Sequence, residues 1–179
     1  MARNPFKRSV DVPADVLAAA PLEIGENVLA GTVASDGSWL LGTRDALLIT
    51  GAGRVAGDAG ARIPWQHVER VDWDREQERL RVIEVGEFGK VRPEYTFEIA
   101  DPGLLLEFIR ERVTASVVLQ RHVAVSGKKG LFVIARRAPR GDSEITWSYE
   151  FDRGIDPDDP EVMVAAQRGL DAAAEELGL

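Results

Sequence analysis

The clearest strand pattern lies in WLLGTRDALLIT at residues 39–50 and in RIPWQHVERVDWDREQERLRVIEV at residues 62–85. Apolar and polar residues alternate through both of them with the two-residue period of half-buried β-strands. Pro64 lacks an N–H and therefore suits a strand end or a corner, and the polar run at residues 74–77 supplies a turn before the next strand. This order predicts a small antiparallel β-structure.

The same alternation predicts seven strands before the first long helix. The turn at residues 35–38 contains Asp and Gly, which supply the backbone angles of a hairpin. The seven strands are expected at residues 26–34, 39–42, 46–50, 62–65, 71–73, 80–84 and 95–99. The loop at residues 51–60 contains four glycines and no large apolar side chain, so we expect it to bury nothing.

An amphipathic helix is predicted from Asp101 onward. Asp101 suits the cap position, and Pro102 follows where its missing N–H costs nothing. Apolar residues then recur every fourth position on one face, which indicates packing against the open end of the β-structure. These residues are Leu105, Ile109, Val113 and Val117.

The sequence continues beyond this helix with an extension of its own. Strands are expected at residues 122–126, 131–137 and 145–151, and Asp159-Pro160 then opens a second capped helix. We therefore divide the chain into an N-terminal arm at residues 1–24, a β-structure with its helix at 25–121, and a β-meander with a helix at 122–179. The arm is expected to be loosely attached, with one helical turn at residues 14–20.

Seven short antiparallel strands followed by one helix resemble a bacterial pleckstrin-homology-like (PH-like) domain. The resemblance covers residues 26–121 and includes the strand GTRDALLIT and the corner RIPWQHVERVDWD. The whole sequence is also similar to short alanine- and arginine-rich actinobacterial proteins. The resemblance implies a seven-stranded barrel capped by the helix, within an α+β fold, and a module that binds peptide, protein or lipid headgroup. The first hairpin, at residues 35–38, has no Lys or Arg for the phosphate of such a headgroup.

Composition excludes several classes of protein. The 179 residues are 45% hydrophobic and 29% charged, as expected for a globular protein. No apolar run approaches the roughly 20 residues of a membrane helix, and no apolar run follows the basic N-terminus as in a secretory signal. The chain has no cysteine, which removes disulfides, thiol nucleophiles and thiolate metal ligands. We expect a cytoplasmic protein.

Residues that could carry catalysis or bind a metal lack the necessary patterns. Asp72 and Asp74 have neither the glycine nor the distal glutamate of a calcium loop. His67 and His122 are the only histidines, and no nucleophile elbow accompanies them. The segment SGKKG at residues 126–130 lacks the spacing of a phosphate loop. We therefore expect no catalytic residue, cofactor or metal, and a protein that is not an enzyme.

Charge is distributed unevenly along the chain. Residues 110–140 hold eight basic side chains and one acidic one, whereas the segments before and after them carry net charges of −6 and −9. The basic turns and the corner tryptophan are the candidate contacts for a partner: Trp65, Arg121, Lys128, Lys129, Arg136, Arg137 and Arg140. In an antiparallel meander the turns at 128–129 and 136–140 lie at opposite ends. Alternatively, these charges pair internally with the acidic C-terminal region, at Asp142, Glu144, Asp152 and the last helix.

The sequence as a whole predicts a binding module rather than an enzyme. The favoured function is an adaptor that contacts an unidentified protein partner. The alternative is binding of an anionic ligand, either nucleic acid or a phospholipid headgroup, through the basic segment at residues 121–140. The net charge of −8 argues against general affinity for nucleic acid.

Overall fold

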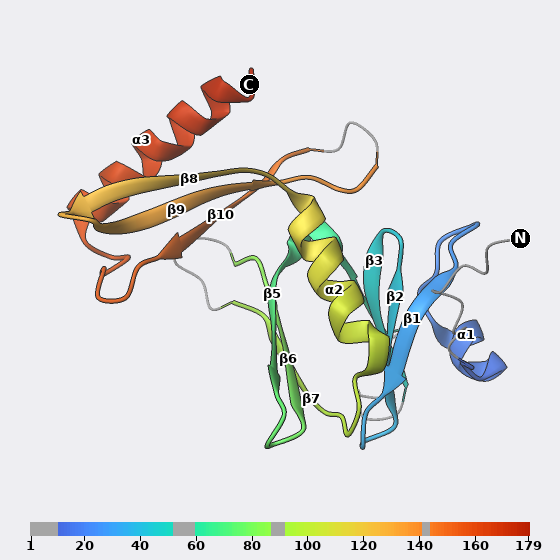
Figure 1. Cartoon of the computed structure of the whole chain (residues 1–179). Helices are drawn as coiled ribbons and strands as arrows, with labels where there is room; N and C mark the ends of the chain where they lie inside the picture. The colour runs from blue at the N-terminus through green and yellow to red at the C-terminus, as the bar shows by residue number, and fades with distance from the viewer. Residues whose placement is uncertain (1–10, 52–59, 87–91, 141–143) are drawn as a thin grey trace, which may run out of the picture.

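A computed structural model describes residues 11–51, 60–86, 92–140 and 144–179. Within these residues the protein has ten strands, three α-helices and one 3₁₀-helix (Figure 1). In chain order the elements are α1 (Ala14–Ala19), β1 (Val28–Val33), β2 (Ser38–Thr43), β3 (Ala46–Gly51), β4 (Ala61–Pro64), η1 (Trp65–His67), β5 (Val68–Asp74), β6 (Arg79–Glu84), β7 (Glu94–Glu98), α2 (Gly103–Ser116), β8 (Val117–Ser126), β9 (Lys129–Arg136), β10 (Thr146–Phe151) and α3 (Pro160–Glu176). Most of the expected loop at residues 51–60 lies outside the described residues.

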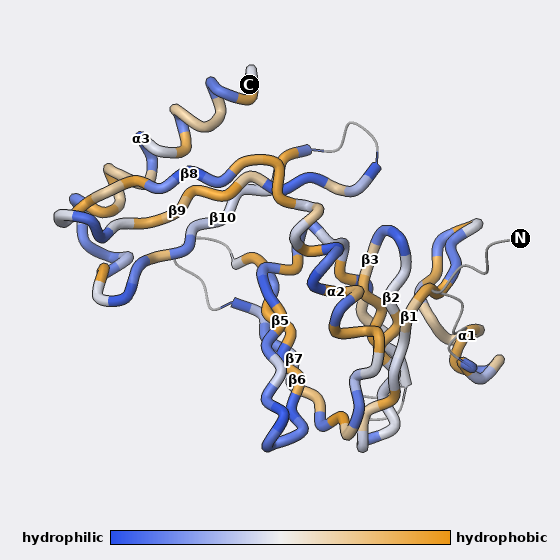
Figure 2. Tube along the Cα trace, viewed as in Figure 1, coloured by the Kyte–Doolittle hydropathy of each residue, from blue (hydrophilic) through white to orange (hydrophobic). Residues whose placement is uncertain are grey.

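The C-terminal extension is a three-stranded antiparallel sheet in the order β10-β9-β8, with α3 across one face. The central strand β9 is hydrophobic along most of its length (Figure 2). Leu131 and Val133 of β9 are fully buried and belong to one apolar cluster with Val162 and Ala166 of α3. A three-stranded meander followed by a helix is the arrangement that the sequence predicts for this region.

The boundary between α2 and β8 differs from the prediction. The chain leaves the helix after Ser116, and β8 begins at Val117 rather than at His122. Val117 and Val118 are adjacent β-branched residues, which favour a strand over another helical turn. The predicted division between residues 121 and 122 therefore falls inside a single strand.

The prediction of a closed seven-stranded barrel is wrong. The first seven strands form two separate antiparallel sheets, one of four strands in the order β1-β2-β3-β4 and one of three in the order β5-β6-β7. Between β4 and β5 the chain turns through Pro64 and η1, and the two strands do not pair in the described structure. At the other side, the turn after β1 meets the end of β7 through one backbone bond, from Ser35 N–H to Glu98 O at 2.8 Å. The sheets therefore face each other without a continuous ladder.

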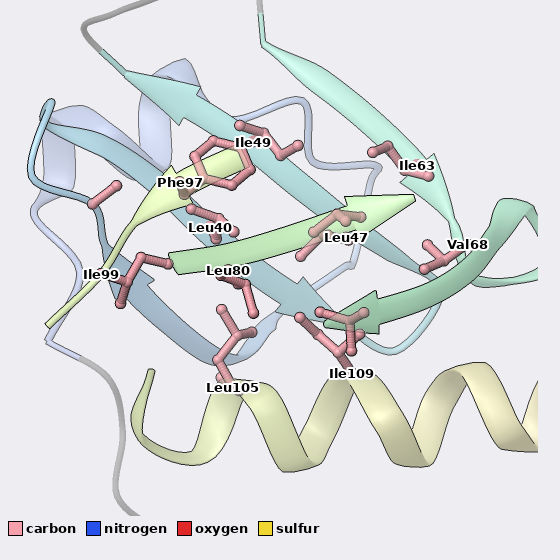
Figure 3. Close-up of a cluster of buried hydrophobic side chains, with 14 of the residues drawn as sticks. Leu40, Leu47, Ile49, Ile63, Val68, Leu80, Phe97, Ile99, Leu105 and Ile109 are labelled. Atoms are coloured by element: carbon pink, nitrogen blue, oxygen red, sulfur yellow. The ribbon is translucent and has the colours of Figure 1, made fainter. Parts of the chain in front are cut away.

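Helix α2 fills the space between the two sheets. Leu105 and Ile109 on its inner face are fully buried, and they pack with Leu40 and Leu47 of the first sheet and Leu80 of the second (Figure 3). Complete burial of one such side chain contributes about 1.5–3 kcal/mol of hydrophobic stabilisation. The single core, rather than strand pairing, holds these two sheets together.

The described part of the N-terminal arm is attached to the first sheet. Val16 of α1 packs against the buried Leu48 on the outer face of that sheet. Glu23 is also held, because Arg62 Nε on β4 lies 3.2 Å from its Oε1. The expectation of a loose arm does not hold for residues 11–24.

Candidate functional site

Trp65 is buried in the core, contrary to the prediction of a partly exposed contact. Its exposed fraction is 0%, and its indole N–H donates to the carbonyl oxygen of Thr43 at 3.1 Å. The ring meets Phe108 of α2 edge-on, with the centroids 5.9 Å apart. Pro64 and the 3₁₀ turn direct the side chain inward between β4 and α2, so Trp65 offers no surface to a partner.

Arg136 is also buried, at 3% exposure, and it holds the C-terminal sheet against the rest of the protein. Its Nη1 donates to Val113 O and to Ser116 Oγ at the end of α2, both at 3.2 Å. Its Nη2 donates to Glu69 O of β5 at 3.1 Å. Burial lowers the pKa of the Arg136 guanidinium. This residue is part of an internal junction, not of a basic surface.

The carboxylate of Glu69 forms the acidic side of the same junction. It accepts a hydrogen bond from Arg92 Nη1 at 2.6 Å, and Arg92 Nη2 donates to Tyr149 O of β10 at 3.0 Å. Burial raises the pKa of Glu69, and the charge of Arg92 offsets this effect only in part. Its second oxygen, Oε2, is buried without a hydrogen-bond partner in the described residues.

Two more of the predicted basic contacts are engaged in ion pairs. Arg121 Nη1 lies 3.2 Å from Glu176 Oε2 of α3, as the alternative of internal pairing with the last helix predicts. Arg140 Nε donates to Asp45 Oδ1 at 3.1 Å, and Asp45 belongs to the turn between β2 and β3. The second pair crosses from the C-terminal segment to the first sheet, and no pattern of residues predicts it.

The remaining candidates lie at both ends of the meander. Lys128 is exposed at the β8–β9 turn, and Lys129 Nζ donates to Arg153 O at 3.2 Å. Arg137 is half-buried just beyond β9, and its backbone N–H donates to Ser116 O at 2.8 Å. The structure therefore does not bring the seven predicted contacts together into one surface.

The histidine of the meander has a structural role. Asp152 Oδ2 accepts the Gly130 N–H at 2.7 Å and lies 3.1 Å from His122 Nε2. The ring of His122 also packs against Phe132, with the centroids 4.7 Å apart. These contacts close the β8–β9 turn against the residue that follows β10.

The exposed side of α3 is the better candidate for a contact surface. Met163 and Val164 are large apolar side chains that are 45% and 50% exposed. Val164 also borders a hollow of about 430 Å³, which is lined by Pro160, Glu161, Val164, Ala165 and Arg168. Adjacent exposed apolar side chains with a polar rim are typical of surfaces that bind other proteins.

The sequence contained a signal for this surface that the prediction did not use. The inward face of α3 carries Val162 and Ala166, which are both buried. Met163 and Val164 are apolar but lie off that stripe, so a two-sided apolar helix could have been noticed. No such signal was available for Glu69, since its partners come from distant parts of the chain.

Comparison with known proteins gives no relative for this chain, because no protein-family model, curated protein or solved structure matches it. In the described ranges, no three His, Asp or Glu side chains gather closely enough to hold a metal ion. The three helices that the structure describes are too short or too polar to cross a membrane.

Proposed function

We propose that this chain is a non-enzymatic, cytoplasmic binding module that contacts a protein partner through the exposed side of α3. The observation that carries the proposal is the exposed pair Met163 and Val164, of which Val164 lines the hollow at the start of the helix. Burying the exposed half of such side chains in a complex contributes about 25 cal/mol per Å² of apolar area. Glu161 and Arg168 supply polar groups at the rim of the same hollow.

The alternative of an anionic ligand has less support. Arg136 is buried, and Arg121 and Arg140 are paired with Glu176 and Asp45. Lys128 and Lys129 are exposed at one end of the meander, and the other candidates do not join them there, so two charges remain in place of a larger basic surface. The order of seven strands followed by α2 supports the proposed relation to PH-like domains, whose members mostly bind other molecules, although the strands form two open sheets.

A differential co-purification tests the proposed surface. Tagged wild-type protein, Val164→Asp and Leu104→Asp are recovered from the same host at modest salt, and bound proteins are quantified by mass spectrometry. Leu104 on α2 is 47% exposed, so its substitution is a matched control for adding one charge to an exposed apolar site. We expect a partner that wild type and Leu104→Asp retain and that Val164→Asp recovers at a level about tenfold lower, as for loss of an interface hot spot.

The opposite results are equally informative. Equal recovery by all three proteins, with unchanged thermal unfolding of Val164→Asp, would exclude this side of α3. Recovery that falls steeply with salt and with Lys128→Ala would favour the anionic alternative.

A further inference from the structure

β8 is an outer strand of the C-terminal sheet and has an unpaired edge. It is ten residues long, and β9 is its only neighbouring strand in the described structure. None of its residues is fully buried, and Val118 is 44% exposed. In the parts of the chain that are described, the backbone groups of residues 118–126 form no hydrogen bond outside this sheet.

The hydrogen bonds of Gly130 show which backbone groups of β8 face outward. Its N–H and C=O both bond to Asp152, on the β10 side. Because the bonding direction alternates along a strand, Leu131 faces β8, where it is opposite Val123. The backbone groups of Val123, Arg121 and Leu119 therefore bond to β9. The N–H and C=O groups of residues 120, 122 and 124 point away from the sheet.

Long edges of this kind are usually protected, and the regularly paired stretch of β8 at residues 119–124, between its two register shifts, is not. Proteins shorten an edge strand, place proline or lysine on it, or cover it, because free N–H and C=O groups attract another strand. β4 has four residues and ends in Pro64, and the Tyr149 carbonyl on β10 accepts a hydrogen bond from Arg92. β8 contains no proline or lysine, and Arg121, its one permanently charged residue, is paired with Glu176.

We propose that β8 pairs in antiparallel orientation with β8 of a second copy of this chain, which joins two three-stranded sheets into one of six strands. The two-fold axis passes through His122, so that His122 lies opposite the partner's His122 and Gln120 opposite the partner's Ala124. This register joins the outward-facing backbone groups of the two strands. The inference does not rest on the proposed function, and the two surfaces share Arg168, which also lines the hollow of α3.

Charge favours a second copy in this register. A shift of the axis to Arg121 would place two guanidinium groups directly opposite each other, and like charges in that position are destabilising. α3 also contributes, since Gly169 lies over Val123 and Glu176 pairs with Arg121, which shows that α3 runs antiparallel to β8. The axis therefore passes between Gly169 and Glu176. It brings Arg168 level with the partner's Glu175, which gives two symmetric pairings of opposite charge.

The test uses the absence of cysteine from the natural sequence. In the proposed register the Cα atoms of His122 and the partner's His122 are about 5.5 Å apart, within reach of a disulfide. His122→Cys should therefore form a covalent dimer under mild oxidation. Gln120→Cys is the matched control on the same face of β8. Its equivalent positions are offset by four residues, or about 14 Å along the strand, and should not cross-link.

Sedimentation equilibrium of the unmodified wild-type protein provides a second measurement. We expect a reversible dimer, and we expect Gln120→Pro, which removes an outward N–H, to shift it to monomer while Gln120→Thr does not. A wild-type monomer at high micromolar concentration would overturn the proposal and leave the edge open to a different partner. Equal cross-linking of both cysteine variants would also overturn it, because it would indicate random collision.

Discussion

Arg136 Nη2 lies 3.1 Å from the backbone oxygen of Glu69, and this hydrogen bond joins the end of β9 to the beginning of β5. The same guanidinium also binds the end of α2, at Val113 O. A residue from the basic segment is therefore one of the main connections between the two parts of the chain. Its charge is used inside the protein, where donors to carbonyl oxygens replace the lost contacts with water.

Replacing Arg136 with methionine should destabilise the protein strongly. The substitution removes the hydrogen bonds to Glu69 O and Val113 O; Ser116 Oγ still donates to Val113 O, but Glu69 O loses its bond from the guanidinium. We expect the free energy of unfolding to fall by about 3 kcal/mol, as for removal of one member of a buried polar pair. Urea denaturation measures it. The control Arg110→Met changes an exposed position on α2 and should have an effect within about 0.5 kcal/mol; equal effects would contradict the structural role.

Glu69 should make stability depend on pH in the direction opposite to a surface carboxylate. Burial raises its pKa above the usual 4.5, so the folded protein binds this proton more tightly than the unfolded chain. The free energy of unfolding of wild type relative to Glu69→Gln should therefore decrease as pH rises from about 4 to 7. Urea denaturation of both proteins across this range measures the difference.

Glu94 provides the control of opposite sign. The hydrogen bond from Arg81 holds the pKa of Glu94 below its usual value. Its stabilising contribution is therefore present above pH 4.5 and is lost as the pH falls through the lowered pKa. If the free energy of unfolding of wild type relative to Glu69→Gln instead grew with rising pH, the charge of Arg92 would have a larger effect on the pKa of Glu69 than burial has.

Trp65→Phe should reduce stability without affecting any binding surface. The substitution keeps an aromatic ring in the core but removes the indole N–H that satisfies the Thr43 carbonyl. An unsatisfied buried acceptor costs about 1–3 kcal/mol, which equilibrium denaturation should detect. Trp73→Phe, at a half-buried position of β5, is the matched control and should cost less. A change in partner recovery for Trp65→Phe at full stability would restore its predicted contact role.

Gly130→Ala should disrupt the β8–β9 pairing. A Cβ at this position would lie 1.8 Å from the Val123 carbonyl oxygen, which belongs to the paired strand and cannot move aside alone. We expect a loss of more than about 3 kcal/mol. Gly127→Ala places its Cβ in open space at a φ of +62°, so it should cost only about 1–2 kcal/mol of backbone strain. Denaturation followed by tryptophan fluorescence compares the two, and similar losses would contradict the close approach.

Local patterns were sufficient to predict most elements. Residue alternation located the strands, and the cap of α3 was correct because Asp159 accepts the Glu161 N–H at 2.8 Å. The prediction was less successful at α2, where the apolar period continued into Val117 although the chain had already become a strand. The spacing of residues gives no information on which strands pair, so it could not distinguish the barrel that the resemblance implied from two separate sheets.

The candidate contacts also show what local patterns do not predict. Trp65 was a candidate contact because it lies between Pro64 and Gln66 at a corner, and the structure buries it against Phe108. Arg136 and Lys129 were both expected at basic turns, yet one is buried at a junction and the other is exposed at a turn. Only the position of α2 and β5 distinguishes them.

The sequence by itself determined the order and type of the elements, the absence of thiol chemistry and the uneven charge, since these depend on residues close together in the chain. The tertiary structure shows which charges are internal, which apolar side chains of α3 remain exposed and which edge of the C-terminal sheet is unpaired. Those properties depend on contacts such as Arg136 with Glu69 and Arg140 with Asp45, which join residues 67 and 95 positions apart. Burial and pairing are properties of neighbours in space, and no local pattern specifies neighbours at such separations.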